Sequence, residues 1–441
     1  MSAKLDLLKD KESALLWKYM IPSVGGMLGL SVCIFFDTMF IGRRLGEIGL
    51  ASLNIAVPLF NLYYAVAMTF GVGGATALSI AIGQKKKHKI NAIFTSSLIG
   101  ALAVIIILNI VGYFFIDNIC YLLGASAETF PYVKDYIKVI LNWNAIFIIS
   151  NILNVFVRSD KAPKLSMMSI IVTNIANIML DYLFIYPLNM GMEGAALATT
   201  IAQGIGVLVL FIHFFGENNS LHIEFKAVKA KKIIEIISNG MPSFVTELSA
   251  GFVIIIFNNI ILSIGGNVAV SAYGIIANVA LIFLAVFNGI SQGMQPLVSI
   301  NHGAGESQRV NTLFRISFRI SLIIGVVFCL IGVLLPNQII AIFTSQTGEF
   351  VNITVNGMRI YFISFILMGA NIVGIAYLQA MQKNKSSFIL STFRGLILTI
   401  VLVIILSKLF GLTGVWMTIP IVELITFAAF LILKQKNKKQ K

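Results

Sequence analysis

The chain has 441 residues, of which 58% are hydrophobic and only 11% are charged, and its mean hydropathy is +0.93. About a quarter of the residues of a soluble domain are charged, so these values exclude a soluble protein and indicate one that crosses a membrane many times. The formal net charge of +14 would suggest nucleic-acid binding in a soluble protein. Here the basic residues lie in short segments between apolar runs, as membrane anchors do, and we expect no nucleic-acid partner.

Twelve apolar stretches are long enough to cross a bilayer as helices. Their continuous apolarity favours helices over the alternating strands of a barrel. We therefore predict an all-α integral membrane protein with twelve transmembrane helices, at about 17–41, 51–82, 91–115, 134–157, 165–187, 193–215, 234–264, 270–300, 312–335, 355–381, 387–407 and 412–433.

The first span contains one acid, Asp37, deep among apolar residues. An ionised carboxylate there costs about 2.5–3.5 kcal/mol or more unless it faces a partner or a wet cavity, so Asp37 is a candidate functional residue. The same span begins near Pro22. That proline is either a hinge that bends when Asp37 changes state or the site of a static kink.

The fifth span carries Asn174, Asn177 and Asp181, spaced to lie on one stripe of a helix. Together with Asp37 and with Thr199 of the sixth span, this stripe offers carboxylate, amide and hydroxyl oxygens. Such a group suits a small hard cation such as Na⁺, or a pair of acids that shares one proton. The alternative is that the asparagines join helices by hydrogen bonds and that Asp181 lies near the outer interface.

The polar segment 216–232 divides the chain into halves of six spans each, 1–215 and 233–441. The halves are repeats, because a shift of 220 positions places Pro22 on Pro242, Gly46 on Gly266 and Gly83 on Gly303. An even number of spans per half keeps both halves in one orientation. We therefore predict two parallel six-helix repeats with a site between or within the lobes.

The second half has two acids inside spans. Glu247 in the seventh span either snorkels to the interface or lines a cavity that attracts cations. Glu423 in the last span matches Gln203 in the first half, which suggests a position that faces protein or water in both lobes.

Aromatic residues near these acids could bind lipophilic cations by cation–π contact. As candidates to line a substrate cavity we take Phe36, Tyr63, Tyr182 and Phe283, together with Glu247. The three cysteines have no metal or disulfide spacing, and we interpret them as small apolar residues. No motif for ATP binding, hydrolysis or zinc binding is present, so we expect neither an enzyme nor a cofactor.

The basic residues predict the orientation. With the N-terminus inside, 26 of the 32 lysines and arginines fall in inside segments, Arg158, Arg394 and a basic C-terminal tail among them. This bias predicts that both termini are cytoplasmic.

The ensemble of motifs resembles the multidrug and toxic compound extrusion (MATE) family over essentially the whole chain. The matching stretches are the first-span Pro22, Asp37, Thr38 and Gly42, then LGEIGLASLNIAVPLF at 45–60, GVGGATALSIAIGQ at 71–84, and the fifth and sixth spans at 166–203. The resemblance implies a monomeric, multi-pass protein of the bacterial cell membrane with V-shaped lobes, which exports amphipathic and mostly cationic compounds by H⁺ or Na⁺ antiport.

The DinF-like and MepA-like branch of that family implies a cation site at Asp37, Asn177, Asp181 and Thr199. Another branch uses second-lobe acids, but the tenth span of this chain has none, so the resemblance favours coupling in the first lobe. The alternative is a flippase of lipid-linked precursors, from the same superfamily. Such a protein would need a more cationic cavity, whereas the midspan charges predicted here are acids.

Overall fold

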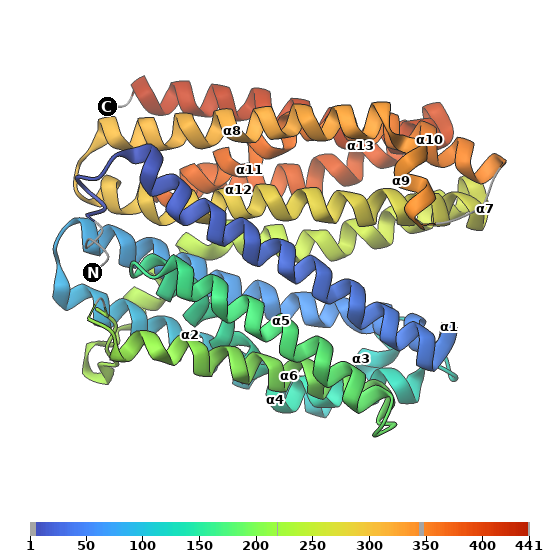
Figure 1. The fold of residues 1–441 in the computed structure, drawn as a ribbon, viewed down its shortest axis with the longest axis horizontal. Coiled ribbons are helices and arrows are strands. Elements are labelled where there is room, and N and C mark those ends of the chain that lie inside the picture. The colour runs from blue at the N-terminus through green and yellow to red at the C-terminus, as the bar shows by residue number, and fades with distance from the viewer. Residues whose placement is uncertain (1–5, 218, 344–347, 440–441) are drawn as a thin grey trace.

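The computed structural model describes residues 6–217, 219–343 and 348–439, and within them the chain is helical with no strand (Figure 1). The helices of the first half are α1 (Glu12–Gly83), α2 (Lys87–Phe114), α3 (Ile116–Leu122), α4 (Phe130–Ser159), α5 (Pro163–Ile185), α6 (Gly191–Phe211), η1 (Ile212–Phe215) and η2 (Phe225–Ala227). Those of the second half are α7 (Ala230–Gly303), α8 (Ser307–Leu334), α9 (Pro336–Phe343), α10 (Glu349–Tyr361), η3 (Phe362–Ser364), α11 (Phe365–Ala380), α12 (Asn384–Thr392), η4 (Phe393–Ile397) and α13 (Leu398–Lys439).

Nine helical segments of the described chain are long and apolar enough to cross a membrane. Three of them, in α1, α7 and α13, contain one glycine with a positive φ and non-helical dihedral angles: Gly46, Gly266 and Gly411. Each of these glycines turns the chain back, so the nine segments make the twelve predicted spans. The loops expected at these three turns are absent, because one glycine in a backbone conformation that other residues rarely adopt makes the whole turn.

These turns also show the repeat. Gly46 and Gly266 are 220 residues apart, and so are Gly191 and Gly411, which both have positive φ. Each half forms its own apolar core, and Figure 1 shows the two lobes lying side by side with both termini at one end.

The first helix of each half begins in the core of the other lobe. Leu15, Tyr19 and Met20 of α1 pack in the second core, whereas Ile236 of α7 packs in the first. Each of these helices therefore crosses between the lobes, so the division of the chain at 216–232 does not coincide with the packing boundary at this end of the molecule.

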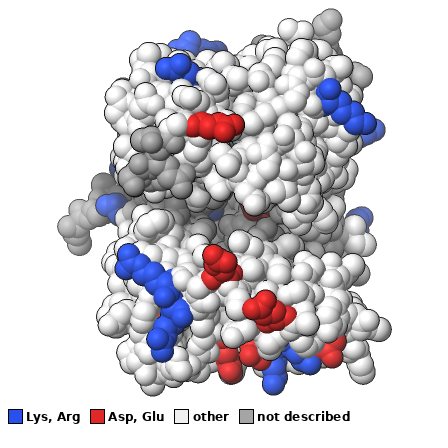
Figure 2. Space-filling model, turned by 90° about the vertical axis from the view of Figure 1, so that its right-hand side faces the viewer, with Lys and Arg blue, Asp and Glu red and all other residues white. Residues whose placement is uncertain are grey.

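Glycines bring α1 and α7 into close contact near the end that carries the termini. A Cβ atom on Gly73 would lie 2.2 Å from the Ile236 carbonyl oxygen, and one on Gly303 would lie 2.3 Å from the Ile80 carbonyl oxygen. The lobes are therefore closed on each other at this end. The opposite end, which faces the viewer in Figure 2, is hollowed along the line between the lobes.

The segment that joins the halves is held against the first lobe. The buried carboxylate of Asp160 accepts hydrogen bonds from His213 Nε2 at 2.8 Å, from the Ser220 backbone N–H at 2.8 Å and from the Ser220 hydroxyl. Further along, the Glu224 N–H donates to Thr95 Oγ1 at 2.8 Å. The predicted linker, residues 216–232, is thus hydrogen-bonded to the end of the molecule where the lobes meet, and we call this segment the clasp.

Candidate functional site

The two acids of the first lobe lie together. Asp37 is carried by the first span of α1 and Asp181 by α5, and their carboxyl groups are close enough to interact electrostatically. Asp181 is 0% exposed. Both of its oxygens, and Oδ1 of Asp37, are buried without a hydrogen-bond partner in the described structure. Buried polar atoms in proteins nearly always have partners, so this pair is suited to hold a cation.

Beside the acids, a directional chain of hydrogen bonds links α1, α5 and α6. Cys33 Sγ donates to Asn177 Oδ1 at 2.7 Å, Asn177 Nδ2 donates to Thr199 Oγ1 at 3.4 Å, and Thr199 Oγ1 donates to the Ala195 carbonyl at 3.2 Å. Because the Thr199 hydroxyl gives its proton to the backbone, its oxygen must accept from the amide. This fixes the orientation of Asn177 and aims its oxygen at Cys33.

The structure therefore brings together Asp37, Asn177, Asp181 and Thr199, the four residues selected from the sequence. It also shows a role for Cys33 that the interpretation as a small apolar residue missed. The sequence could have predicted this contact, since Cys33 lies four residues before Asp37 and hence on the same helix face. Tyr136 of α4, which is buried and within electrostatic range of both carboxylates, had no such signal.

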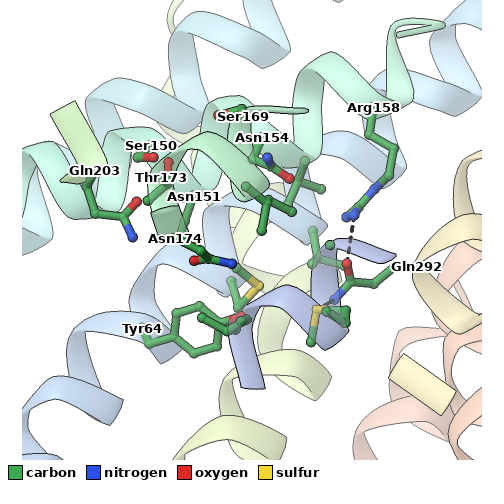
Figure 3. Close-up of a pocket in the computed structure, with 17 residues that line it drawn as sticks. Tyr64, Ser150, Asn151, Asn154, Arg158, Ser169, Thr173, Asn174, Gln203 and Gln292 are labelled. Carbon is green, nitrogen blue, oxygen red and sulfur yellow. Dashed lines mark hydrogen bonds between the residues drawn. The ribbon is translucent and has the colours of Figure 1, made fainter. Parts of the chain in front are cut away.

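A cavity opens in the first lobe beside this cluster (Figure 3). Ten of its seventeen lining residues have polar side chains. The polar side chains that line it are Tyr64, Ser150, Asn151, Asn154, Arg158, Ser169, Thr173, Asn174, Gln203 and Gln292. No lining residue is acidic, and Arg158 is the one charged residue in the lining.

Arg158 was expected to be a loop anchor, and this expectation is wrong. Its side chain is buried, with the residue 4% exposed, and lies at the end of α4 between the lobes. Its Nη1 donates to Oε1 of Gln292 on α7 at 2.7 Å, the contact drawn in Figure 3.

Arg394 was also counted among the basic residues of the inside segments, although it falls within the predicted span 387–407, and it lies inside the helical bundle. It sits in the π-helical turn η4 and forms an ion pair with Glu423, with Nη2 2.7 Å and Nε 2.9 Å from Oε1. Asn371 Nδ2 donates to Oε2 of the same carboxylate at 2.7 Å. Glu423 is 2% exposed, so it faces protein rather than water.

The repeat relates this ion pair to the cavity of the first lobe. Shifted back by 220 positions, Asn371, Arg394 and Glu423 fall on Asn151, Asn174 and Gln203. These three all line the cavity. At these three positions the first lobe thus has neutral amide side chains that line a cavity, whereas the second lobe has a hydrogen-bonded ion pair.

None of the four aromatic candidates lines this cavity. Tyr63 is buried and donates to Asn109 Oδ1 at 3.1 Å, and Phe283 stacks on Phe328 with ring centroids 3.9 Å apart inside an aromatic cluster of the second lobe. Both rings therefore pack within the apolar cores of their lobes.

The remaining candidates, Phe36, Tyr182 and Glu247, lie outside the cavity lining as well. Phe36 is half-buried and contacts Phe40, and Tyr182 is exposed beside Phe40 and Tyr186. Glu247 is half-buried on α7, within electrostatic range of Tyr64 in the cavity wall. Pro22 is buried, and the one non-helical residue of α1 is Gly46, so the helix passes Pro22 without a break.

Comparisons with known proteins agree on the family. The MatE family model matches residues 22–183 and 242–431. The multidrug export protein MepA of Staphylococcus haemolyticus is 27% identical over 435 residues, which cover 97% of this chain and 95% of that protein. MepA of Staphylococcus aureus (strain MSSA476) is 27% identical over 419 residues, covering 94% and 92%.

Among solved structures, the fold is similar to that of a multidrug resistance MATE family transporter of the MOP superfamily in an outward-facing conformation. The TM-score is 0.91 at 22% identity, with 99% of this chain and 98% of that chain covered.

Proposed function

Because the chain belongs to the MatE family of membrane transporters, we propose that it is a secondary exporter in which inward movement of H⁺ or Na⁺ drives the efflux of amphipathic compounds. The relatives named as multidrug export proteins support this direction of transport and a broad range of substrates.

One observation carries the proposal: both carboxylate oxygens of Asp181 and Oδ1 of Asp37 are buried without hydrogen-bond partners in the described structure. Two carboxylates in an apolar site strongly favour a state in which they share a proton or bind a cation. Asn177 and Thr199 each keep a lone pair beyond the hydrogen bonds that they accept, so the same site suits Na⁺ as well as H⁺.

The arrangement of the lobes supports a mechanism. They are closed at the end that carries the termini and hollowed at the other. With Arg158 and Arg394 removed from the 26 inside residues, 24 of the 32 lysines and arginines still favour cytoplasmic termini. In that orientation, in a bacterial cell membrane, the structure is outward-facing.

In the proposed cycle, the cation reaches Asp37 and Asp181 from outside and binds between α1 and α5. Neutralising the pair removes the repulsion between two helices that both line the cavity, since α1 contributes Gly26 and α5 contributes Asn174. The helices then close on the cavity and displace the substrate. Release of the cation inside resets the site.

Substrates with a cationic group are part of this proposal. Since no acid lines the cavity of the first lobe, we assign recognition of that group to Glu247 on α7, beside Tyr64. A flippase of lipid-linked precursors is less well supported. Arg158 and Arg394 do place cations inside the bundle, but Arg394 is neutralised by Glu423, and the relatives are named for multidrug export.

The test is ethidium efflux from energised cells that express the wild type, Asp37→Asn or Asp135→Asn. Asp135 is an exposed carboxylate on α4 and serves as the matched control. We expect Asp37→Asn to reach the membrane at normal abundance and to lose efflux, while Asp135→Asn exports like the wild type. Normal efflux by Asp37→Asn would remove the proposed role of the acid pair.

A further inference from the structure

Arg158 is a buried cation with no acidic partner in the described structure. Its guanidinium has five N–H donors, and its hydrogen bond in the described structure, at 2.7 Å, joins Nη1 to the neutral amide of Gln292. Arginine stays charged in proteins, and a buried charge is normally paired. The charge of Arg158 therefore needs an explanation that the lobe contact alone does not supply.

Neither Asp160 nor Glu247 neutralises Arg158 through an ion pair in the described structure. Asp160, two residues further on, accepts bonds from His213 and Ser220. Glu247 on α7 interacts electrostatically with Tyr64, as Arg158 also does. No ion pair joins Arg158 to either acid within the described residues.

The second lobe shows how this chain neutralises a half-buried arginine inside the bundle. Arg394 has a carboxylate, Glu423, at 2.7 Å, and that carboxylate is further held by Asn371. At the position equivalent to Glu423 the first lobe has Gln203, a neutral amide in the cavity wall. The lobe that contains the unpaired arginine is thus the one that lacks the acid.

Arg158 also faces empty space. It lines the cavity of the first lobe together with Asn151, Asn154 and Asn174 (Figure 3), and it lines a smaller space between the lobes with Gln292 and Gln295. Its lining combines apolar side chains such as Met68 and Val72 with polar ones, as ligand-binding cavities do. The fork of a guanidinium matches a carboxylate with two parallel hydrogen bonds, and the surrounding amides can bond to neutral polar groups of the same ligand.

We propose that the cavity of the first lobe binds amphipathic substrates that carry a carboxylate, with Arg158 as the residue that receives it. The inference rests on the proposed export function and specifies one class of its substrates. A zwitterion would satisfy both poles, with its carboxylate at Arg158 and its cationic group toward Glu247. This cavity therefore has the opposite preference to that expected of a site lined by acids.

The experiment compares two fluorescent probes, dansylglycine and dansylglycinamide, which differ in the carboxylate. Their equilibrium binding to purified full-length protein is measured by fluorescence titration. We expect the wild type to bind dansylglycine at least tenfold more tightly than the amide, and Arg158→Gln to bind the two probes equally. Arg315→Gln removes an exposed arginine of α8 and should keep the wild-type preference.

A second variant keeps the proposal testable if Arg158→Gln does not fold. Gln292→Glu supplies the missing acid 2.7 Å from Nη1, and it should remove the preference for the carboxylate while Arg158 is retained. Equal binding of the two probes by the wild type, or a preference that persists in both variants, would overturn the proposal. Because the titration needs no ion gradient, Asp37→Asn should retain the preference, so a failure of coupling and a failure of substrate recognition are distinguishable.

Discussion

Replacing Gly240 by alanine should open the contact between the lobes. A Cβ atom at Gly240 would lie 2.0 Å from the carbonyl oxygen and 2.6 Å from the carbonyl carbon of Thr69, whereas ordinary contact begins at 3.4 Å. The obstacle is backbone and cannot rotate away, so α1 and α7 must separate by about 3.4 − 2.0 = 1.4 Å. Overpacking of this kind costs about 1–3 kcal/mol, which corresponds to a shift of roughly 5- to 150-fold in a conformational equilibrium.

The assay is the rate of maleimide labelling of Ser79→Cys in purified protein. Ser79 is buried between the lobes beside Pro296 and Ser299, so its accessibility reports on separation of the lobes at this end. The control is Gly274→Ala on the same helix, where an added Cβ meets nothing within 4 Å. We expect labelling to be at least fivefold faster with Gly240→Ala than with Gly274→Ala. Equal labelling rates would refute the assignment of this glycine contact as the closure between the lobes.

Two further predictions concern the buried carboxylates outside the acid pair. Glu423→Gln leaves Arg394 without its carboxylate and should lower the free energy of unfolding by about 3–5 kcal/mol, measured by denaturant titration with the exposed variant Glu349→Gln as control. The double variant Arg394→Asn/Glu423→Gln should lose less stability than the two single variants combined. Additive losses of stability would argue against the ion pair. Asp160→Asn weakens charge-assisted hydrogen bonds worth about 1.5–3 kcal/mol each, so trypsin should cut after Lys226 or Lys229 at least tenfold faster than in Glu217→Gln, and an unchanged rate would argue against the clasp.

The number of spans and the repeat follow from the sequence because apolar length and glycine position are local properties. Gly46 and Gly266 stand out in the alignment of the halves and turn the chain as the repeat requires. What the alignment does not show is that a turn needs no loop, or that α1 and α7 begin in the opposite lobe, since both depend on packing between distant helices.

The acid cluster was accessible to sequence reasoning because a membrane carboxylate is costly wherever it lies. The two arginines were not, since a positive charge near the end of a span looks the same whether it anchors a loop or lies inside the bundle. Arg394 and Glu423 are 29 residues apart, and the contact of Arg158 with Gln292 crosses 134 residues. No local pattern connects residues at such separations.

The most direct test of the central claim, that Asp37 and Asp181 couple a cation gradient to export, is ethidium transport in proteoliposomes under an imposed pH gradient and, separately, an imposed sodium gradient. We expect the wild type and Asp135→Asn to accelerate transport with at least one gradient, and Asp37→Asn and Asp181→Asn to show no gradient-dependent transport. Gradient-driven transport by both asparagine variants at the wild-type rate would contradict the account.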